Sequence, residues 1–150
     1  MKMRCMLPGL ALLVCLAMSS QALAHCEIPC GIYDDALRVS LLKEHLVTIE
    51  KSMETIKALE KDTHPDMNQL VRWIMNKEDH ANQFQEIVSQ YFMTQRIGLD
   101  SGQYTQKVQV LHHMLVGAMR CKQSTDTAHV QSLRRLIKEF EELYFDHSHE

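Results

Sequence analysis

Apolar residues recur at alternating steps of three and four positions in four stretches of the chain that follow residue 35. This spacing places them on one face of an α-helix, which turns once every 3.6 residues. The connections between stretches are short and polar, as in residues 62–66 and 124–126. The pattern therefore predicts four amphipathic helices. In chain order their apolar stripes are Val39, Leu42, Leu46, Ile49, Met53, Ile56 and Leu59; Met67, Leu70, Ile74, Ala81, Phe84, Val88 and Tyr91; Val108, Leu111, Leu115 and Ala118; and Val130, Leu133, Ile137, Phe140 and Tyr144.

Neither strand-like alternation nor an internal repeat nor a low-complexity segment interrupts this pattern. Short connections between amphipathic helices are typical of an antiparallel bundle. The sequence thus predicts an all-α fold, an antiparallel four-helix bundle over residues 35–150, with Asp34 or Asp35 as the N-cap of its first helix. Methionines on the stripes are expected to fill the core.

Residues 1–24 have the pattern of a cleaved signal peptide. Lys2 and Arg4 give a positive start, an apolar run follows up to residue 18, and Ala22-Leu23-Ala24 is an A-x-A cleavage site. The run is shorter than the roughly 20 apolar residues that a bilayer span needs, which makes a retained membrane anchor the weaker interpretation. We expect cleavage after Ala24, a periplasmic or secreted protein, and no stable membrane association afterwards.

Cleavage would remove two of the 16 basic residues and none of the 19 acidic ones, which changes the formal net charge from −3 to −5. A negative chain of this kind does not suggest a nucleic-acid partner. It also offers no overall attraction for an anionic substrate, so any steering of such a substrate has to be local.

Cys26, Cys30 and Cys121 remain after cleavage, and this odd number excludes a complete set of disulfides within one chain. Export favours a Cys26–Cys30 disulfide with Cys121 free. The alternative is that the first two cysteines capture a metal ion. Cys121 is expected to be a buried apolar thiol rather than a ligand.

The new N-terminus would concentrate metal ligands in a few residues. His25 offers an α-amine and an imidazole, Cys26 a thiolate and its backbone amide nitrogen, and Cys30 a second thiolate. Pro29 favours the tight turn that returns Cys30 to the metal, and Gly31 lets the chain leave in a conformation closed to other residues. Two nitrogens and two sulfurs in a plane suit Ni(II) or Cu(II) better than zinc, which prefers a tetrahedron.

The ten residues from His25, HCEIPCGIYD, resemble the nickel-binding hook of nickel superoxide dismutases, whose pattern is H-C-x-x-P-C-G-x-Y. Every fixed position of that pattern is met. The resemblance implies a metal-binding hook over residues 25–34 ahead of the bundle, and the family fold is itself a four-helix bundle. It also implies that His25 supplies the amine and an axial imidazole, that Cys26 and Cys30 supply thiolates, and that Tyr33 gates the approach to the metal.

The same resemblance implies an enzyme with one nickel ion per subunit, which converts superoxide to dioxygen and hydrogen peroxide by cycling between Ni(II) and Ni(III). It further implies a homohexamer. Two positions depart from the family, because many members have Asp in place of Glu27 and Pro in place of Asp35. Glu27 keeps the charge with a longer reach, so it is a candidate for a different contact around the metal.

A metal-bound imidazole generally needs a partner that fixes its orientation, and in this family a carboxylate and an arginine hold it. Glu44, on the first expected helix, is a candidate carboxylate. The run KEDHA at residues 77–81 resembles a family K-E-x-x-A stretch in which the arginine precedes the alanine. In this chain His80 takes the place of the arginine, and Glu78 lies beside it.

These candidates also have ordinary interpretations. Glu78 and Lys77 can form a solvated ion pair, and His80 can be a surface histidine. Residues 89–92 resemble a family S-x-Y-F stretch whose tyrosine lies near the metal. The corresponding Tyr91 also falls on a core stripe, where it can simply be a packed aromatic residue.

Two other functions remain open on the sequence. A non-catalytic nickel or copper carrier would use the same ligands without redox cycling. A periplasmic helical adaptor would carry a Cys26–Cys30 disulfide and no metal. Neither gives Gly31 or Tyr33 a particular reason to be present, which favours the dismutase.

Overall fold

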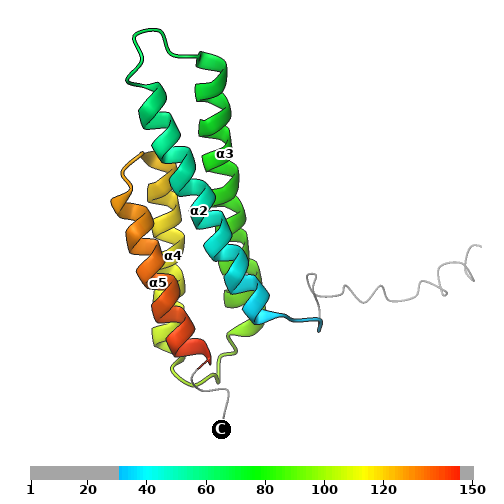
Figure 1. The fold of residues 1–150 in the computed structure, drawn as a ribbon. Coiled ribbons are helices and arrows are strands. Elements are labelled where there is room, and N and C mark those ends of the chain that lie inside the picture. Colours follow the sequence, from blue (N-terminus) through cyan, green and yellow to red (C-terminus); the bar gives the residue numbers. More distant parts are fainter. Residues whose placement is uncertain (1–30, 146–150) are drawn as a thin grey trace, which may run out of the picture. The chain divides into compact units, whose positions relative to one another are not determined.

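The computed structural model describes residues 31–145, in which helical rods run alternately up and down beside one another (Figure 1). They are α2 (Asp35–Leu59), α3 (Met67–Glu86) with its π-helical continuation η1 (Ile87–Arg96), α4 (Tyr104–Gln123) and α5 (Ala128–Phe145). α2 packs on α3 and α5, and α4 packs on the same two helices. None of the described residues forms a strand, so the predicted all-α antiparallel four-helix bundle is confirmed. No helix within residues 31–145 is both long and apolar enough to span a membrane.

Aspartate side chains begin the first two of these helices. The Asp34 carboxylate accepts a hydrogen bond from the backbone N–H of Leu37 (2.9 Å), so that Asp34 rather than Asp35 caps α2. Asp66 caps α3 in the same way. Each cap satisfies N–H groups that have no acceptor within the first turn of the helix. Asp34 thereby leaves the side chain of Asp35 available for other partners.

Most of the predicted stripe positions lie in the buried core. Those that do are Val39, Leu42, Leu46, Ile49, Met53, Ile56, Ala81, Phe84, Val88, Tyr91, Leu111, Ala118, Val130, Leu133, Ile137 and Phe140. Cys121 is fully buried as well, as predicted. Phe92 lies beside the second stripe, and its ring meets Phe140 edge-on at a centroid distance of 4.9 Å and Tyr144 at 5.6 Å. These rings join η1 to α5 within the core.

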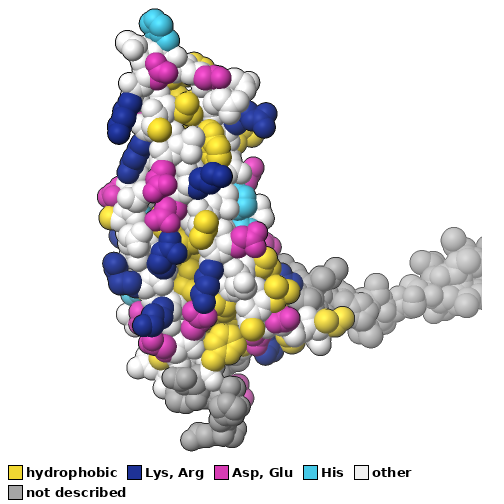
Figure 2. Space-filling model, viewed as in Figure 1, with side chains coloured by type: hydrophobic (Ala, Val, Ile, Leu, Met, Phe, Trp, Pro, Cys, Tyr) yellow, Lys and Arg dark blue, Asp and Glu magenta, His cyan; other side chains and the backbone are white. Residues whose placement is uncertain are grey.

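The stripe prediction is wrong for the first half of α3. Met67 is 60% exposed and Ile74 is 40% exposed. In Figure 1, α2 and α3 extend beyond the ends of α4 and α5, so that the start of α3 has only α2 to pack against. Figure 2 shows hydrophobic side chains at the surface, among charged ones, over this part of the molecule. Periodicity identified the apolar face but not the length over which neighbours cover it.

We predict that Phe92→Ala lowers the free energy of unfolding by about 3–5 kcal/mol. The reason is that the Phe92 side chain is fully buried and its removal leaves a cavity against Phe140 and Tyr144. Urea denaturation followed by circular dichroism measures the change. Leu99→Ala is the control, because Leu99 is 86% exposed and its loss should change stability by less than about 0.5 kcal/mol. Equal effects of the two substitutions would contradict the packing described here.

Candidate functional site

The predicted metal ligands His25, Cys26 and Cys30, together with the neighbouring Glu27, lie outside the residues that the structure describes. Within residues 31–145, no three His, Cys, Asp or Glu side chains come together in a way that could hold a metal ion. A site with three or more such ligands is therefore not found in this part of the chain.

The described chain begins at the end of the predicted hook, with Gly31 at a φ of +77°. This is the left-handed region, which glycine enters without the steric penalty that a side chain brings. No atom lies within 4 Å of the position that a Cβ would take, so the backbone conformation, rather than a lack of space, is what requires glycine. This confirms the conformation predicted for Gly31. Tyr33, the predicted gate, is 38% exposed.

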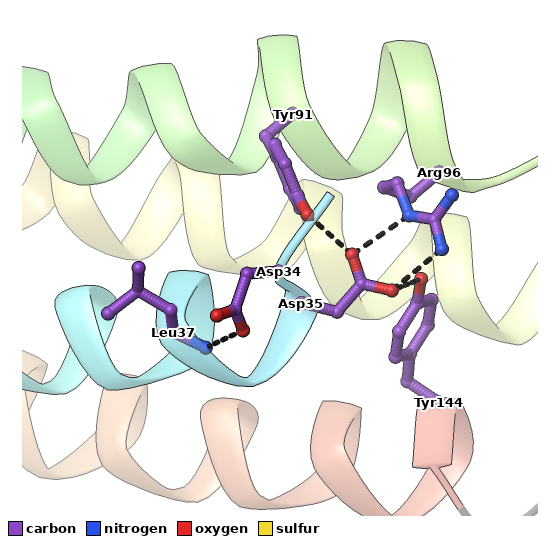
Figure 3. A network of polar contacts seen from close by, with 6 residues as sticks. All are labelled: Asp34, Asp35, Leu37, Tyr91, Arg96 and Tyr144. Atoms are coloured by element: carbon purple, nitrogen blue, oxygen red, sulfur yellow. Dashed lines mark hydrogen bonds and ion pairs between the residues drawn. The ribbon is translucent and has the colours of Figure 1, made fainter. Parts of the chain in front are cut away.

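A single carboxylate at the start of α2 collects side chains from two other helical elements (Figure 3). Asp35 Oδ1 accepts hydrogen bonds from the Tyr91 hydroxyl (2.6 Å) and from Arg96 Nε (2.8 Å). Asp35 Oδ2 accepts from Arg96 Nη2 (2.8 Å) and from the Tyr144 hydroxyl (2.8 Å). We call Asp35, Tyr91, Arg96 and Tyr144 the Asp35 cluster. It ties the first residue of α2 to η1 and to α5.

The π-helical geometry of η1 explains how two of these side chains reach one carboxylate. Tyr91 and Arg96 are five residues apart, and an α-helix turns 100° per residue, which would place them about 140° apart around the axis. A π-helix instead hydrogen-bonds residues five apart, as the Ile97 N–H does to the Phe92 carbonyl (2.9 Å). The wider turn brings Tyr91 and Arg96 to the same side of the helix, facing Asp35.

The electrostatics of the cluster hold its charges and protons in place. Burial raises the pKa of the Asp35 carboxyl, but the hydrogen bonds from Arg96, Tyr91 and Tyr144 outweigh burial and bring the pKa below its ordinary 3.8. Burial and the Asp35 carboxylate raise the pKa of Tyr91 to about 12, and they raise the pKa of Tyr144 as well. At neutral pH Asp35 is therefore ionised. Both phenols keep their protons, and each hydroxyl donates a hydrogen bond to the carboxylate.

We predict that Asp35→Asn lowers the free energy of unfolding at pH 7 by about 1.5–3 kcal/mol, the usual value of a hydrogen bond to a charged group. The amide would also turn an N–H group toward donors that need an acceptor. Because the folded state lowers the pKa of Asp35, this stability is present above the unfolded-state value near 3.9 and is lost as the pH falls through the lower folded value.

Urea denaturation of both proteins at pH 7 and at about pH 2.5 measures this pH dependence, and the difference between them should shrink at the lower pH. Asp100→Asn is the matched control, since Asp100 is exposed in the loop before α4 and should contribute little at either pH. A difference for Asp35→Asn that is the same at both pH values would show that the charge of Asp35 is not what stabilises the fold.

His80 contacts a residue that the sequence did not single out. Its Nδ1 atom lies 2.9 Å from Nδ1 of His45, and the pair links α3 to α2 in a partly buried position. Burial and the neighbouring His80 lower the pKa of His45, while Glu44 acts in the opposite direction. His80 is therefore half-buried and has a histidine partner on α2.

Glu78 is not a free carboxylate, because it forms an ion pair with Lys77. Glu78 lies 3.4 Å from the ammonium group of Lys77, and Lys77 is only 4% exposed. The Lys77 ammonium also donates to the backbone carbonyls of Cys121 and Lys122 near the end of α4. Lys77 is thus buried rather than solvated and joins α3 to α4, whereas the Glu78 side chain is 33% exposed. Glu44, the other candidate, is exposed.

Cys121, the cysteine within the described residues, is an unreactive thiol. Burial raises the pKa of the Cys121 thiol to about 11, against the opposing effect of Lys77. At neutral pH Cys121 is therefore protonated, whereas a metal ligand or a nucleophile has to be a thiolate. Its fully buried position agrees with the prediction of an apolar core thiol.

Sequence reasoning missed His45, Arg96 and Tyr144 as partners of the candidate residues. One signal was available, and it concerns His45. His45 and His80 each directly precede a core position, Leu46 and Ala81, so that both lie at the edge of the seam between α2 and α3. The π-helix gave no comparable signal, because Arg96 falls on a different face from Tyr91 in the expected α-helix.

The chain matches the family model of nickel-containing superoxide dismutase over residues 20–148. This match covers most of the chain, including the segment that carries the hook motif. No curated protein and no solved structure matches the chain.

Proposed function

The chain belongs to the family of nickel-containing superoxide dismutases, and on this basis we propose that its N-terminal hook is the nickel site at which superoxide is converted. The family establishes an oxidoreductase with a nickel cofactor and superoxide as its substrate. The observation that supports the assignment to the hook most directly is the motif HCEIPCGIY, complete at every fixed position.

The donors in this motif fit nickel. In our proposal His25 contributes its α-amine and imidazole, Cys26 its thiolate and amide nitrogen, and Cys30 a second thiolate. Mixed nitrogen and sulfur donors in a plane suit Ni(II), and the thiolate is the form of cysteine that binds a metal ion. Bound there, nickel would supply the one-electron chemistry, as Ni(II) and Ni(III), that disproportionation of superoxide to dioxygen and hydrogen peroxide requires.

The Asp35 cluster has a positioning role in this proposal. The hook is joined covalently to α2 through Asp34, which caps the helix, and Asp35, which anchors it. Disproportionation consumes two protons for each hydrogen peroxide formed. Tyr91, with a pKa of about 12 and a hydroxyl that donates a hydrogen bond to Asp35, is a poor source of them. We therefore assign Tyr91 to holding the start of α2, and Tyr33 to limiting access to the metal.

We further propose that the enzyme acts after export and as an assembly. Cleavage after Ala24 would create the α-amine of His25, so that one processing event both releases the protein into the periplasm or medium and completes the ligand set. The family resemblance supports a homohexamer with one nickel ion per subunit.

Nickel content and activity test the ligand assignment. We predict that Cys26→Ser or Cys30→Ser abolishes both nickel binding and cyanide-resistant superoxide dismutation in protein purified from nickel-supplied cells, because each change removes a thiolate. Cys121→Ala is the matched cysteine control and should keep its nickel, since Cys121 lies in the core. A wild-type protein that binds nickel without activity would favour a carrier. A metal-free protein with a Cys26–Cys30 disulfide would overturn the proposal.

A residue added before His25 tests the role of the amine. We predict that an extra alanine at this point in the mature protein abolishes activity, because the α-amine moves away from the metal, while circular dichroism shows unchanged helix content. Mass spectrometry of the unmodified protein should find His25 as its first residue. Full activity of the extended form would show that the free amine of His25 is not a ligand.

A further inference from the structure

The contact between His45 and His80 is unusual among the polar contacts of the bundle, because it joins two imidazoles through the same ring atom. The two Nδ1 atoms lie 2.9 Å apart, and the ring planes are tilted by 59° at a centroid distance of 5.1 Å. One ring has to donate its Nδ1–H and the other has to accept it. The pair also spans two helices, α2 and α3, that pack on each other.

Two neutral imidazole nitrogens this close are also spaced as ligands of one metal ion. Metal–nitrogen bonds to histidine are about 2.0–2.1 Å long, so two of them at a right angle place the nitrogens about 2.9 Å apart. A tetrahedral angle would need about 3.3 Å. The observed spacing therefore suits the square-planar or octahedral preference of Ni(II) and Cu(II) better than that of zinc.

We propose that His45 and His80 form a second metal site, in which both Nδ1 atoms chelate one Ni²⁺ or Cu²⁺ ion between α2 and α3. The ion takes the place of the shared proton of the hydrogen bond. The ring that donated its Nδ1–H keeps a proton on Nε2 instead, so chelation needs no net loss of protons from the pair.

The surroundings of His45 and His80 favour an exchangeable metal ion that is open to water, rather than an enclosed structural metal ion. Both histidines are partly exposed, so water can complete the coordination sphere. No further His, Cys, Asp or Glu joins them to make a group of three within residues 31–145, which makes the site weaker and more exchangeable than a closed site. Burial and the mutual contact lower the pKa of His45, which keeps its imidazole in the neutral form that metals bind. The proposal does not rest on the hook.

The test uses the full chain with Cys26→Ser and Cys30→Ser, so that the hook thiolates are absent. Added NiCl₂ or CuCl₂ should bind this protein and raise its Tm, because an ion that joins α2 to α3 binds the folded state more tightly than the unfolded state. His45→Gln or His80→Gln should each weaken binding at least about tenfold, since loss of a direct ligand costs no less than loss of its supporting partner. The double variant should bind the metal no more weakly than either single variant, because one remaining histidine cannot chelate the ion.

Glutamine preserves a polar side chain of similar size, and circular dichroism of each variant checks that it is folded. His112→Gln with His113→Gln is the matched control, because this pair is exposed on α4 with ring centroids 6.2 Å apart. It should leave affinity unchanged. Electron paramagnetic resonance of bound Cu²⁺ should show two histidine nitrogens. Unchanged affinity and Tm response in the His45 and His80 variants, or dependence on only one of them, would overturn the proposal.

Discussion

The carboxylate of Asp35 holds together the end of the bundle from which the N-terminal hook departs. A partly buried carboxylate is costly unless its lone pairs are satisfied, and here the guanidinium of Arg96 and two phenols satisfy them. Because the partners come from η1 and α5, the first turn of α2 is fixed by elements on both sides of it. Asp34 adds the helix cap beside it. The chain therefore enters the bundle at a point that neighbouring helices define.

The contacts of Tyr91 and Arg96 with Asp35 require that η1 be a π-helix. π-helical turns are rare because their hydrogen-bond geometry is less favourable, and they occur frequently at functional sites. In this chain η1 has two structural roles. Tyr91 and Arg96 turn toward Asp35, and Phe92 packs into the core against Phe140. A regular α-helix would direct Arg96 away from the carboxylate. The polar cluster and the aromatic core are thus coupled through ten residues of one element.

The bundle and the hook divide the chemistry between them. The described cluster around Asp35 is saturated, with ionised and protonated groups that stay so at neutral pH. Cys121 is held as a thiol, and Lys77 is bound to the end of α4. Such groups stabilise and position but do not react. In our proposals the reactive thiolates belong to the hook, and His45 and His80 form a second metal site on the bundle.

The sequence alone determined the family, the helical fold and the proposed ligands, because helical periodicity and the hook motif are both local patterns. It also determined the left-handed Gly31 and the buried Cys121. It did not determine the partners of Asp35, which lie 56, 61 and 109 residues away, or that of His80, which lies 35 residues away. Only the tertiary structure decides these contacts, since they depend on how far neighbouring helices overlap and on a π-helical turn that rotates Arg96 into place. Local spacing records which side of a helix a residue occupies, but not what packs against that side.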